Sequence, residues 1–415
     1  MLLYNKSLIL AYYKKIEIFL YCTIILLSHY YIIQIMTTFK APFMKNIRDF
    51  TVSDYTNIDE IKSKYNEWGF VVIENILSSD ECIKSESLLY QDLMPCIDTA
   101  KIEDSKLMDV YKDVKDGKEH FPKESLPGLA SKGFLSLMGL PHGKFAWSLR
   151  TNPKVKSIYA GLHECKENEL CVSLDVPFFT PDSYSRDECL IWSHADQNIH
   201  IKIGSPDSHQ GILYVWDASK HRTTQTVVIP KSHKKEYYEL LNAIPEANYD
   251  NHNGIYITSI PDLQKRAKLL DTWCKEARRI PVPAGALLIF NSRTIHQGYQ
   301  GGLRLAQTIC WEPKIYRTEE ALIKKLQACH MGIATTHWAS IGQHHGVSFI
   351  KSKPQNFAGF GRYFHKNIFP LKNIELEVLT KEANDNYKIK RPTRPPVLSV
   401  EKMLEGIKPE YRYLL

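Results

Sequence analysis

The sequence lacks several patterns that would assign it to a particular class of protein. It has no internal repeat, no Cys-x-x-Cys pair and no basic stripe with interleaved aromatic residues, so its net charge of +7 does not indicate a nucleic-acid partner. Nine cysteines, an odd number spread along the chain, are typical of free thiols in a reducing compartment. We therefore expect a cytoplasmic protein with no nucleic-acid partner.

The composition is that of an ordinary folded protein. The 415 residues are 44% hydrophobic, 24% charged and 11% aromatic, which argues against a largely disordered chain and allows one large domain or two smaller ones. Nothing in the composition indicates an oligomeric state.

One long apolar run lies near the N-terminus. Residues 16–36 approach the length of a membrane-spanning helix and have lysines on both sides, but Glu17 and His29 interrupt the run. Two interpretations stay open. Either the run is a single-pass anchor, which makes the membrane a partner, or translation begins at Met36 or Met44 and residues 1–44 extend the gene model.

Helices are predicted in the first half of the chain and short strands in the second. Residues 68–73 are expected to form a buried strand, a helix should run from Ser78 and Ser79 to about Met94, and a second helix from Asn152 to about His163. Strand patterns cover residues 171–174, 191–194, 211–216, 226–229, 285–290 and 303–311. Short strands without a helix at each crossover favour an antiparallel sandwich or barrel.

These patterns divide the chain into four parts. They are a hydrophobic segment at 1–44, a helical part at 45–170, a β-rich core at 171–320 with an insertion at about 231–279, and a helical and extended region at 321–415. The last part contains a basic, proline-rich run at 390–396, for which an exposed linker is a simpler interpretation than a nuclear-localisation signal.

A candidate metal site begins with His194-Ala195-Asp196. Residues two apart on an extended chain point to the same side, so this imidazole and this carboxylate can reach one ion. His296 is the best third ligand, because it follows a buried strand and a polar turn at residues 283–295. Two histidines and one carboxylate make the open facial site that suits a non-haem Fe(II) oxygenase.

Arg304 and Gln210 are the candidate cofactor-binding residues. Arg304 lies eight positions after His296, in the next predicted strand, and an antiparallel neighbour would place its guanidinium near the metal, where it can hold a carboxylate with two hydrogen bonds. Gln210, like Gln197, either hydrogen-bonds a ligand or only holds a loop.

Two further groups of polar residues have a functional and an ordinary interpretation. Ser292 and Arg293 either support His296 or only close the turn before it. His337 and the pair at 344–345 could form a second metal site, but ordinary surface or core histidines are more common among the sixteen in the chain.

The motifs together resemble the phytanoyl-CoA dioxygenase-like oxygenases. The resemblance covers about residues 60–340, and the motifs follow the family's order. They are Trp68-Gly-Phe-Val-Val-Ile73, Arg150-Thr-Asn-Pro153, His194-Ala-Asp-Gln197, Val228-Ile-Pro-Lys-Ser-His233, Ala284-Gly-Ala-Leu287, Ser292-Arg-Thr-Ile-His296-Gln297 and Gly302-Leu-Arg304.

This resemblance implies both a fold and an activity. The fold class is α+β, with a double-stranded β-helix core of the jelly-roll or cupin type flanked by helices. Fe(II) would bind to His194, Asp196 and His296 as the catalytic centre, and Arg304 would hold the co-substrate 2-oxoglutarate. We expect a dioxygenase, an oxidoreductase that uses O2 to hydroxylate a small-molecule or lipid-like substrate and releases succinate and CO2.

The chain departs from the family at two points. Pro230-Lys231-Ser232-His233 has lysine where the family usually has glycine, and the spacing from His296 to Arg304 is shorter than in phytanoyl-CoA dioxygenase itself. Both departures concern the substrate more than the metal, so phytanoyl-CoA is not assumed. Two alternatives stay open: a binding module that keeps the β-helix without turnover, and a membrane-tethered protein.

Overall fold

The computed structural model describes the central part of the chain. The described residues are 38–93, 133–135, 140–180, 189–197, 208–234, 237, 255–256, 260, 262–299, 301–316 and 334. The predicted apolar run at 16–36, the histidines at 337, 344 and 345, and the basic run at 390–396 lie outside them. Within the part described, no helix combines the length and the apolar character needed to cross a bilayer.

The predicted first strand and both predicted helices are present. They are β3 (Phe70–Ile73), α3 (Ser79–Leu93) and α6 (Pro153–His163). The α3 helix begins with a reciprocal cap, in which the Ser78 hydroxyl accepts from the amide of Glu81 and the Glu81 carboxylate accepts from the amide of Ser78. The Asn152 side chain caps α6 in the same position that its sequence predicted.

Further helices surround the strands. They are α2 (Ile58–Trp68), α5 (Lys144–Arg150) and α8 (Leu263–Glu276), with short 3-10 turns η1 (Ile47–Asp49), η4 (Leu140–His142), η5 (Glu167–Glu169) and η7 (Lys314–Tyr316). Gly69 ends α2 with a φ of 81°, a left-handed conformation that glycine adopts without steric cost.

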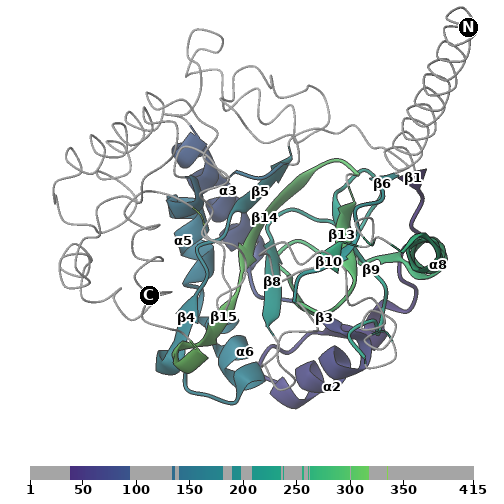
Figure 1. The fold of residues 1–415 in the computed structure, drawn as a ribbon. Helices are drawn as coiled ribbons and strands as arrows, with labels where there is room; N and C mark the ends of the chain where they lie inside the picture. Colours follow the sequence, from purple (N-terminus) through teal and green to yellow (C-terminus); the bar gives the residue numbers. More distant parts are fainter. Residues whose placement is uncertain are drawn as a thin grey trace, which may run out of the picture.

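Two larger sheets form the core (Figure 1). The six-stranded sheet has the order β2 (Thr51–Val52), β3, β12 (Leu287–Asn291), β8 (His209–Tyr214), β14 (Arg304–Ile309), β5 (Pro177–Thr180). The five-stranded sheet has the order β10 (Ile255–Tyr256), β7 (His194–Ala195), β13 (His296–Tyr299), β9 (Gln225–Val228), β11 (Arg278–Arg279). Two small pairs complete the strands: β1 (Thr38–Phe39) with β6 (Cys189–Leu190), and β15 (Trp311–Pro313) with β4 (Leu170–Val172).

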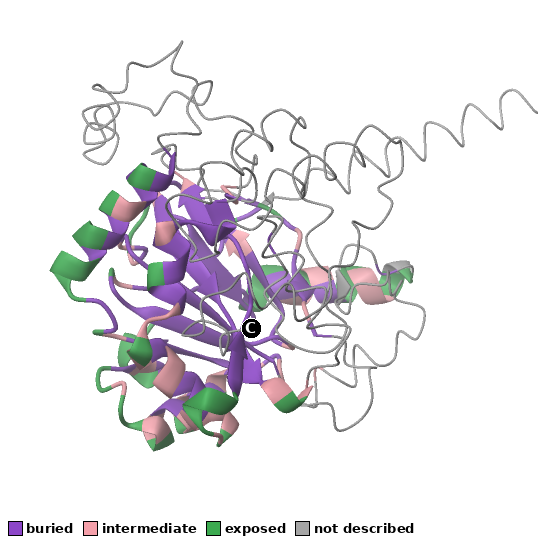
Figure 2. Ribbon diagram, turned by 90° about the vertical axis from the view of Figure 1, so that its left-hand side faces the viewer, coloured by how far each residue is buried: buried purple, intermediate pink, exposed green. Residues whose placement is uncertain are grey.

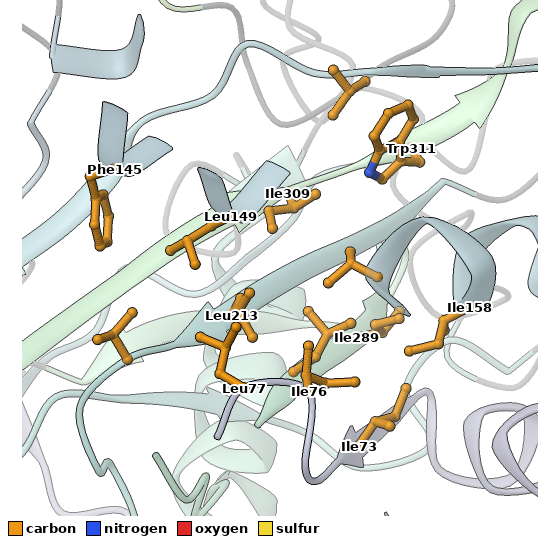
Figure 3. Packing of buried hydrophobic residues seen from close by; sticks show 14 of the residues in the cluster. Ile73, Ile76, Leu77, Phe145, Leu149, Ile158, Leu213, Ile289, Ile309 and Trp311 are labelled. Carbon is orange, nitrogen blue, oxygen red and sulfur yellow. The ribbon is translucent and has the colours of Figure 1, made fainter. Parts of the chain in front are cut away.

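Side chains alternate between the faces of these strands and build three apolar layers. On β12, Leu287 and Ile289 join one cluster with the helices, whereas Leu288 and Phe290 join another between the sheets. Figure 3 shows the first cluster, in which Ile289 lies among side chains of strands and helices. Trp273 of α8 packs in a third cluster, on the outer face of the five-stranded sheet.

The layers confirm the predicted fold class: an α+β protein with two antiparallel sheets facing each other. Figure 2 shows the strands largely buried, while many of the exposed residues lie on the outer sides of the helices. The only parallel pairing among the named strands is β2 with β3, at the edge of the six-stranded sheet. The limits of the four predicted parts stay a prediction, although β10 and α8 both fall within the expected insertion.

Two details of the predicted strands are wrong. The expected strand at 191–194 is interrupted, because β6 ends at Leu190 and β7 begins only at His194. The strand at Arg304 is not a neighbour of the strand at His296, because β14 lies in the six-stranded sheet and β13 in the five-stranded one. Between β13 and β14 the chain passes from one sheet to the other within a few residues. Local hydrophobic periodicity does not indicate in which sheet a strand lies.

The turn in which lysine replaces the family's usual glycine keeps a left-handed backbone. Lys231 has a φ of 67°, and its amide donates to the carbonyl of Trp68. Its ammonium group lies 4.4 Å from the ring centroid of Trp68 and 3.1 Å from the carboxylate of Glu67. These contacts offset the cost of a side chain in this conformation, which is about 1 kcal/mol.

Candidate metal and co-substrate site

Strand pairing brings the two predicted histidine ligands together. His194 on β7 is the direct cross-strand partner of His296 on β13, and their ring centroids are 4.4 Å apart. Their neighbours Ala195 and Ile295 belong to the outer cluster of this sheet, so alternation turns both imidazoles toward the space between the sheets.

Hydrogen bonds orient both rings in the same way. Nδ1 of His194 lies 3.2 Å from the carbonyl of Trp192, and Nδ1 of His296 lies 2.9 Å from the carbonyl of Thr294. A carbonyl accepts only from a protonated nitrogen, so the neutral rings carry their hydrogen on Nδ1 and keep the Nε2 lone pair for a metal. Burial, together with His194, lowers the pKa of His296, which favours the neutral ligand form.

Asp196 completes a group of three ligand atoms. Its Oδ1 lies 3.3 Å from Nε2 of His194, and its Oδ2 lies 3.3 Å from Nε2 of His296. One donor atom from each of the three residues lies within 4.8 Å of the others, and the aspartate side chain is 13% exposed. Two neutral imidazoles and one carboxylate at these separations fit a single divalent ion.

The backbone of Asp196 is held by the turn before β13. The amides of Asp196 and Gln197 both donate to the carbonyl of Ser292 at 2.9 Å. The side chain of Gln210, on β8 of the opposite sheet, donates to Oδ2 of Asp196 at 2.9 Å. Gln197 holds a loop, because its side-chain oxygen accepts from the amide of Ser208.

Arg304 reaches the same space from the six-stranded sheet. It is 6% exposed, its guanidinium lies 3.7 Å from the ring centroid of Phe178, and its Nη2 lies 3.2 Å from the hydroxyl of Tyr214. That hydroxyl lies 3.2 Å from the hydroxyl of Thr226 on the facing sheet. Burial lowers the pKa of Arg304, and Tyr214 opposes this shift.

The guanidinium of Arg304 has no carboxylate partner within the described ranges, and its Nε makes no hydrogen bond there. A buried cation is costly unless an anion or hydrogen-bond acceptors compensate it. The site therefore fits a carboxylate ligand that supplies the missing charge, as the distal carboxylate of 2-oxoglutarate would.

Sequence reasoning missed three aromatic residues at the site. Phe178 and Tyr214 flank Arg304, and Trp192 stacks on His194 with ring centroids 5.1 Å apart. Tyr214 could have been found, because it lies four positions after Gln210 on a strand and so shares its face. The strand with Phe178 was not predicted at all, so no signal pointed to that residue.

A comparison with family models matches residues 166–302 to the phytanoyl-CoA dioxygenase (PhyH) family. The matched segment contains His194, Asp196 and His296 and ends two residues before Arg304. This segment is similar in sequence to the phytanoyl-CoA dioxygenase family. The match confirms the predicted family and the enzyme class, an Fe(II)- and 2-oxoglutarate-dependent dioxygenase.

One curated relative is similar to most of the chain. The Ava biosynthesis cluster protein O of Aspergillus versicolor is 25% identical over 311 residues, which cover 68% of this chain and 91% of that protein. Both chains thus share most of their length at low identity.

Solved structures give weaker likenesses. GIG2 of Candida albicans has a TM-score of 0.41 at 12% identity and covers 86% of this chain and 88% of its own. EctD of S. alaskensis, with 2-oxoglutarate and 5-hydroxyectoine, has a TM-score of 0.38 at 15% identity, with 69% and 87% covered. Scores in this range carry no argument for this chain.

Proposed function

We propose that His194, Asp196 and His296 hold Fe(II), that Arg304 binds the distal carboxylate of 2-oxoglutarate, and that the enzyme hydroxylates a small-molecule or lipid-like substrate. The observation that carries this proposal is the convergence of three ligand atoms from the five-stranded sheet with a buried, uncompensated guanidinium from the facing sheet.

The metal ligands leave room for a co-substrate. An iron ion held by only these three residues would keep positions for exchangeable ligands. With 2-oxoglutarate and O2, such a centre supplies an oxidant strong enough to break a C–H bond, and succinate and CO2 are released. The protein's part is to orient the imidazoles through their Nδ1 hydrogen bonds and to hold the aspartate beside them through Gln210.

The co-substrate's charge would be matched by residues of both sheets. Arg304 can offer two parallel N–H groups to a carboxylate, and the hydroxyls of Tyr214 and Thr226 lie beside it. Binding there would replace the missing anion and point the other end of 2-oxoglutarate toward the metal ligands. This placement explains why an arginine is buried between two aromatic rings.

The surroundings of the site favour an apolar substrate. Phe290 lies 4.7 Å from the ring of His296, Trp192 covers His194, and the cluster between the sheets is aromatic and aliphatic. Such walls exclude water and bind the apolar part of a substrate, whereas a strongly charged substrate would lose its hydration without compensation.

Succinate formation tests the proposal. Full-length protein loaded with Fe(II) is incubated with 2-oxoglutarate in air, and succinate is measured without added substrate, because slow uncoupled turnover is expected. The change Asp196→Ala should abolish succinate, while Asp59→Ala, at an exposed position of α2, should leave it unchanged. Tight binding of metal and 2-oxoglutarate without succinate or O2 consumption would instead favour the non-catalytic binding module.

A further inference from the structure

The backbone of Asp196 lies just outside a β-strand, so hydrogen bonds between strands do not fix the position of its carboxylate. It follows the last residue of β7, Ala195, and its amide bonds to the turn carbonyl of Ser292 instead of to a neighbouring strand. A carboxylate in such a position can bind a metal through one oxygen or through both, and the two modes leave different numbers of coordination positions free.

Gln210 contacts the carboxylate from the opposite sheet. It is 4% exposed, and it shares the inner face of β8 with Ile212 and Tyr214. Its Nε2 donates to Oδ2 of Asp196 and to Oγ of Ser292, both at 2.9 Å. An amide nitrogen has two hydrogens, so both are engaged. The reverse orientation would set the amide oxygen against the carboxylate, which is repulsive.

We propose that Gln210 is a positioning residue for the metal centre. Its amide holds Oδ2 of Asp196, so that Oδ1 alone binds the metal and three positions stay open for 2-oxoglutarate and O2. This inference rests on the proposed Fe(II) site. It replaces the predicted direct contact with the co-substrate, because both amide hydrogens of Gln210 are engaged and its amide oxygen, an acceptor, cannot bond a carboxylate.

Ser292 extends this control to the histidine strand. Its carbonyl holds the backbone of Asp196, its hydroxyl accepts from Gln210, and its turn leads directly into β13 with His296. The link therefore joins both sheets at the metal ligands. Outer hydrogen bonds of this kind to ligands typically change metal affinity by about 10-fold to 100-fold.

Metal affinity and coordination test the proposal in the full chain. The Kd for Ni(II), which imidazole pairs bind well, is measured by calorimetry, and Co(II) absorption reports the coordination number. Gln210→Leu should raise the Kd by about 10-fold to 100-fold and change the Co(II) spectrum toward a higher coordination number. Gln307→Leu removes another buried glutamine of the six-stranded sheet, which bonds carbonyls remote from the metal, and should change neither.

A double-mutant cycle tests whether Gln210 affects metal affinity through Asp196 or through a general change in the fold. In the Asp196→Ala background, Gln210→Leu should leave the Ni(II) affinity within about twofold, because its target is gone. Ser292→Ala removes only the second acceptor and should have the smaller effect of the two single changes. If Gln210→Leu does not fold, Gln210→Met keeps the length of the side chain and serves in its place.

Two results would overturn the inference: equal Ni(II) affinity and equal Co(II) spectra for wild type and the Gln210 variant, or the same loss of affinity with and without Asp196. Failure of the proposed metal site gives a different result, since wild-type protein would then bind neither metal, and loss of turnover alone would leave both metal affinities unchanged.

Discussion

Arg304→Met should weaken 2-oxoglutarate binding without unfolding the protein. In the described part of the chain, the guanidinium has no carboxylate partner, and its one hydrogen bond is to the hydroxyl of Tyr214 at 3.2 Å. Methionine keeps most of the apolar stem that packs on Phe178 and removes the buried charge. We therefore expect this change to reduce the binding free energy of 2-oxoglutarate more than the free energy of unfolding.

The magnitude follows from the bonds that are lost. Hydrogen bonds to charged groups contribute roughly 1.5–3 kcal/mol each, so removing a two-bond fork should raise the Kd for 2-oxoglutarate by at least about 100-fold. The free energy of unfolding should fall by no more than about 1 kcal/mol, since the lost bond to Tyr214 is offset by relief of a desolvated cation.

The assay compares two buried arginines. Calorimetry of metal-loaded protein under anaerobic conditions gives the Kd, and urea denaturation gives the stability. Arg150→Met is the matched control, because Arg150 is fully buried and donates to the carbonyls of Pro141 and Asp175. It should destabilise the fold and leave the 2-oxoglutarate affinity of the folded protein unchanged. Unaltered affinity in Arg304→Met, or a stability loss as large as in the control, would refute the reasoning.

Two further predictions concern stability. Burial raises the pKa of Asp92, which accepts from the amide of Phe145, from 3.8 to about 7, so ionisation costs more in the folded state and its contribution to stability falls as pH rises from about 4 through 7. Asp92→Asn should remove this dependence, which amounts to about 3 kcal/mol between pH 5 and pH 8, as measured in urea melts at these two pH values; parallel curves for both proteins would contradict the prediction. For Lys231, a change to glycine should alter the free energy of unfolding by less than about 1 kcal/mol, because lost contact with Trp68 balances relieved strain, whereas alanine keeps the strain and should be less stable than glycine by about 1 kcal/mol. Equal stability of the glycine and alanine variants would exclude strain at this turn.

Sequence patterns predicted correctly those features that depend only on residues close together in the chain. The caps of α3 and α6 depend on side chains within three residues of the helix start, so Ser78, Glu81 and Asn152 were sufficient to predict them. The motif at His194 and Asp196 was readable for the same reason, because its two side chains are only two positions apart, although β7 ends at Ala195, one residue before the aspartate.

The sequence did not predict the roles of residues whose contacts lie in the facing sheet. Arg304 was expected near the metal by pairing with the strand of His296, yet it arrives from the facing sheet. Gln210 had two equal interpretations, because the sequence contains nothing that says which atom lies opposite its amide. The structure supplies that atom, Oδ2 of Asp196.

The amino-acid sequence alone determined most of the buried strands, the starts of α3 and α6 and the chemistry of the donor set, since each depends on neighbours along the chain. Only the tertiary structure decided that the imidazoles of His194 and His296 form a cross-strand pair, that Gln210 reaches Asp196 from the facing sheet, and that Arg304 enters the space between the sheets from the same side. The physical reason is that the order of strands and the packing of the two sheets against each other depend on the apolar surface buried in the whole core. A short segment of sequence does not determine that total.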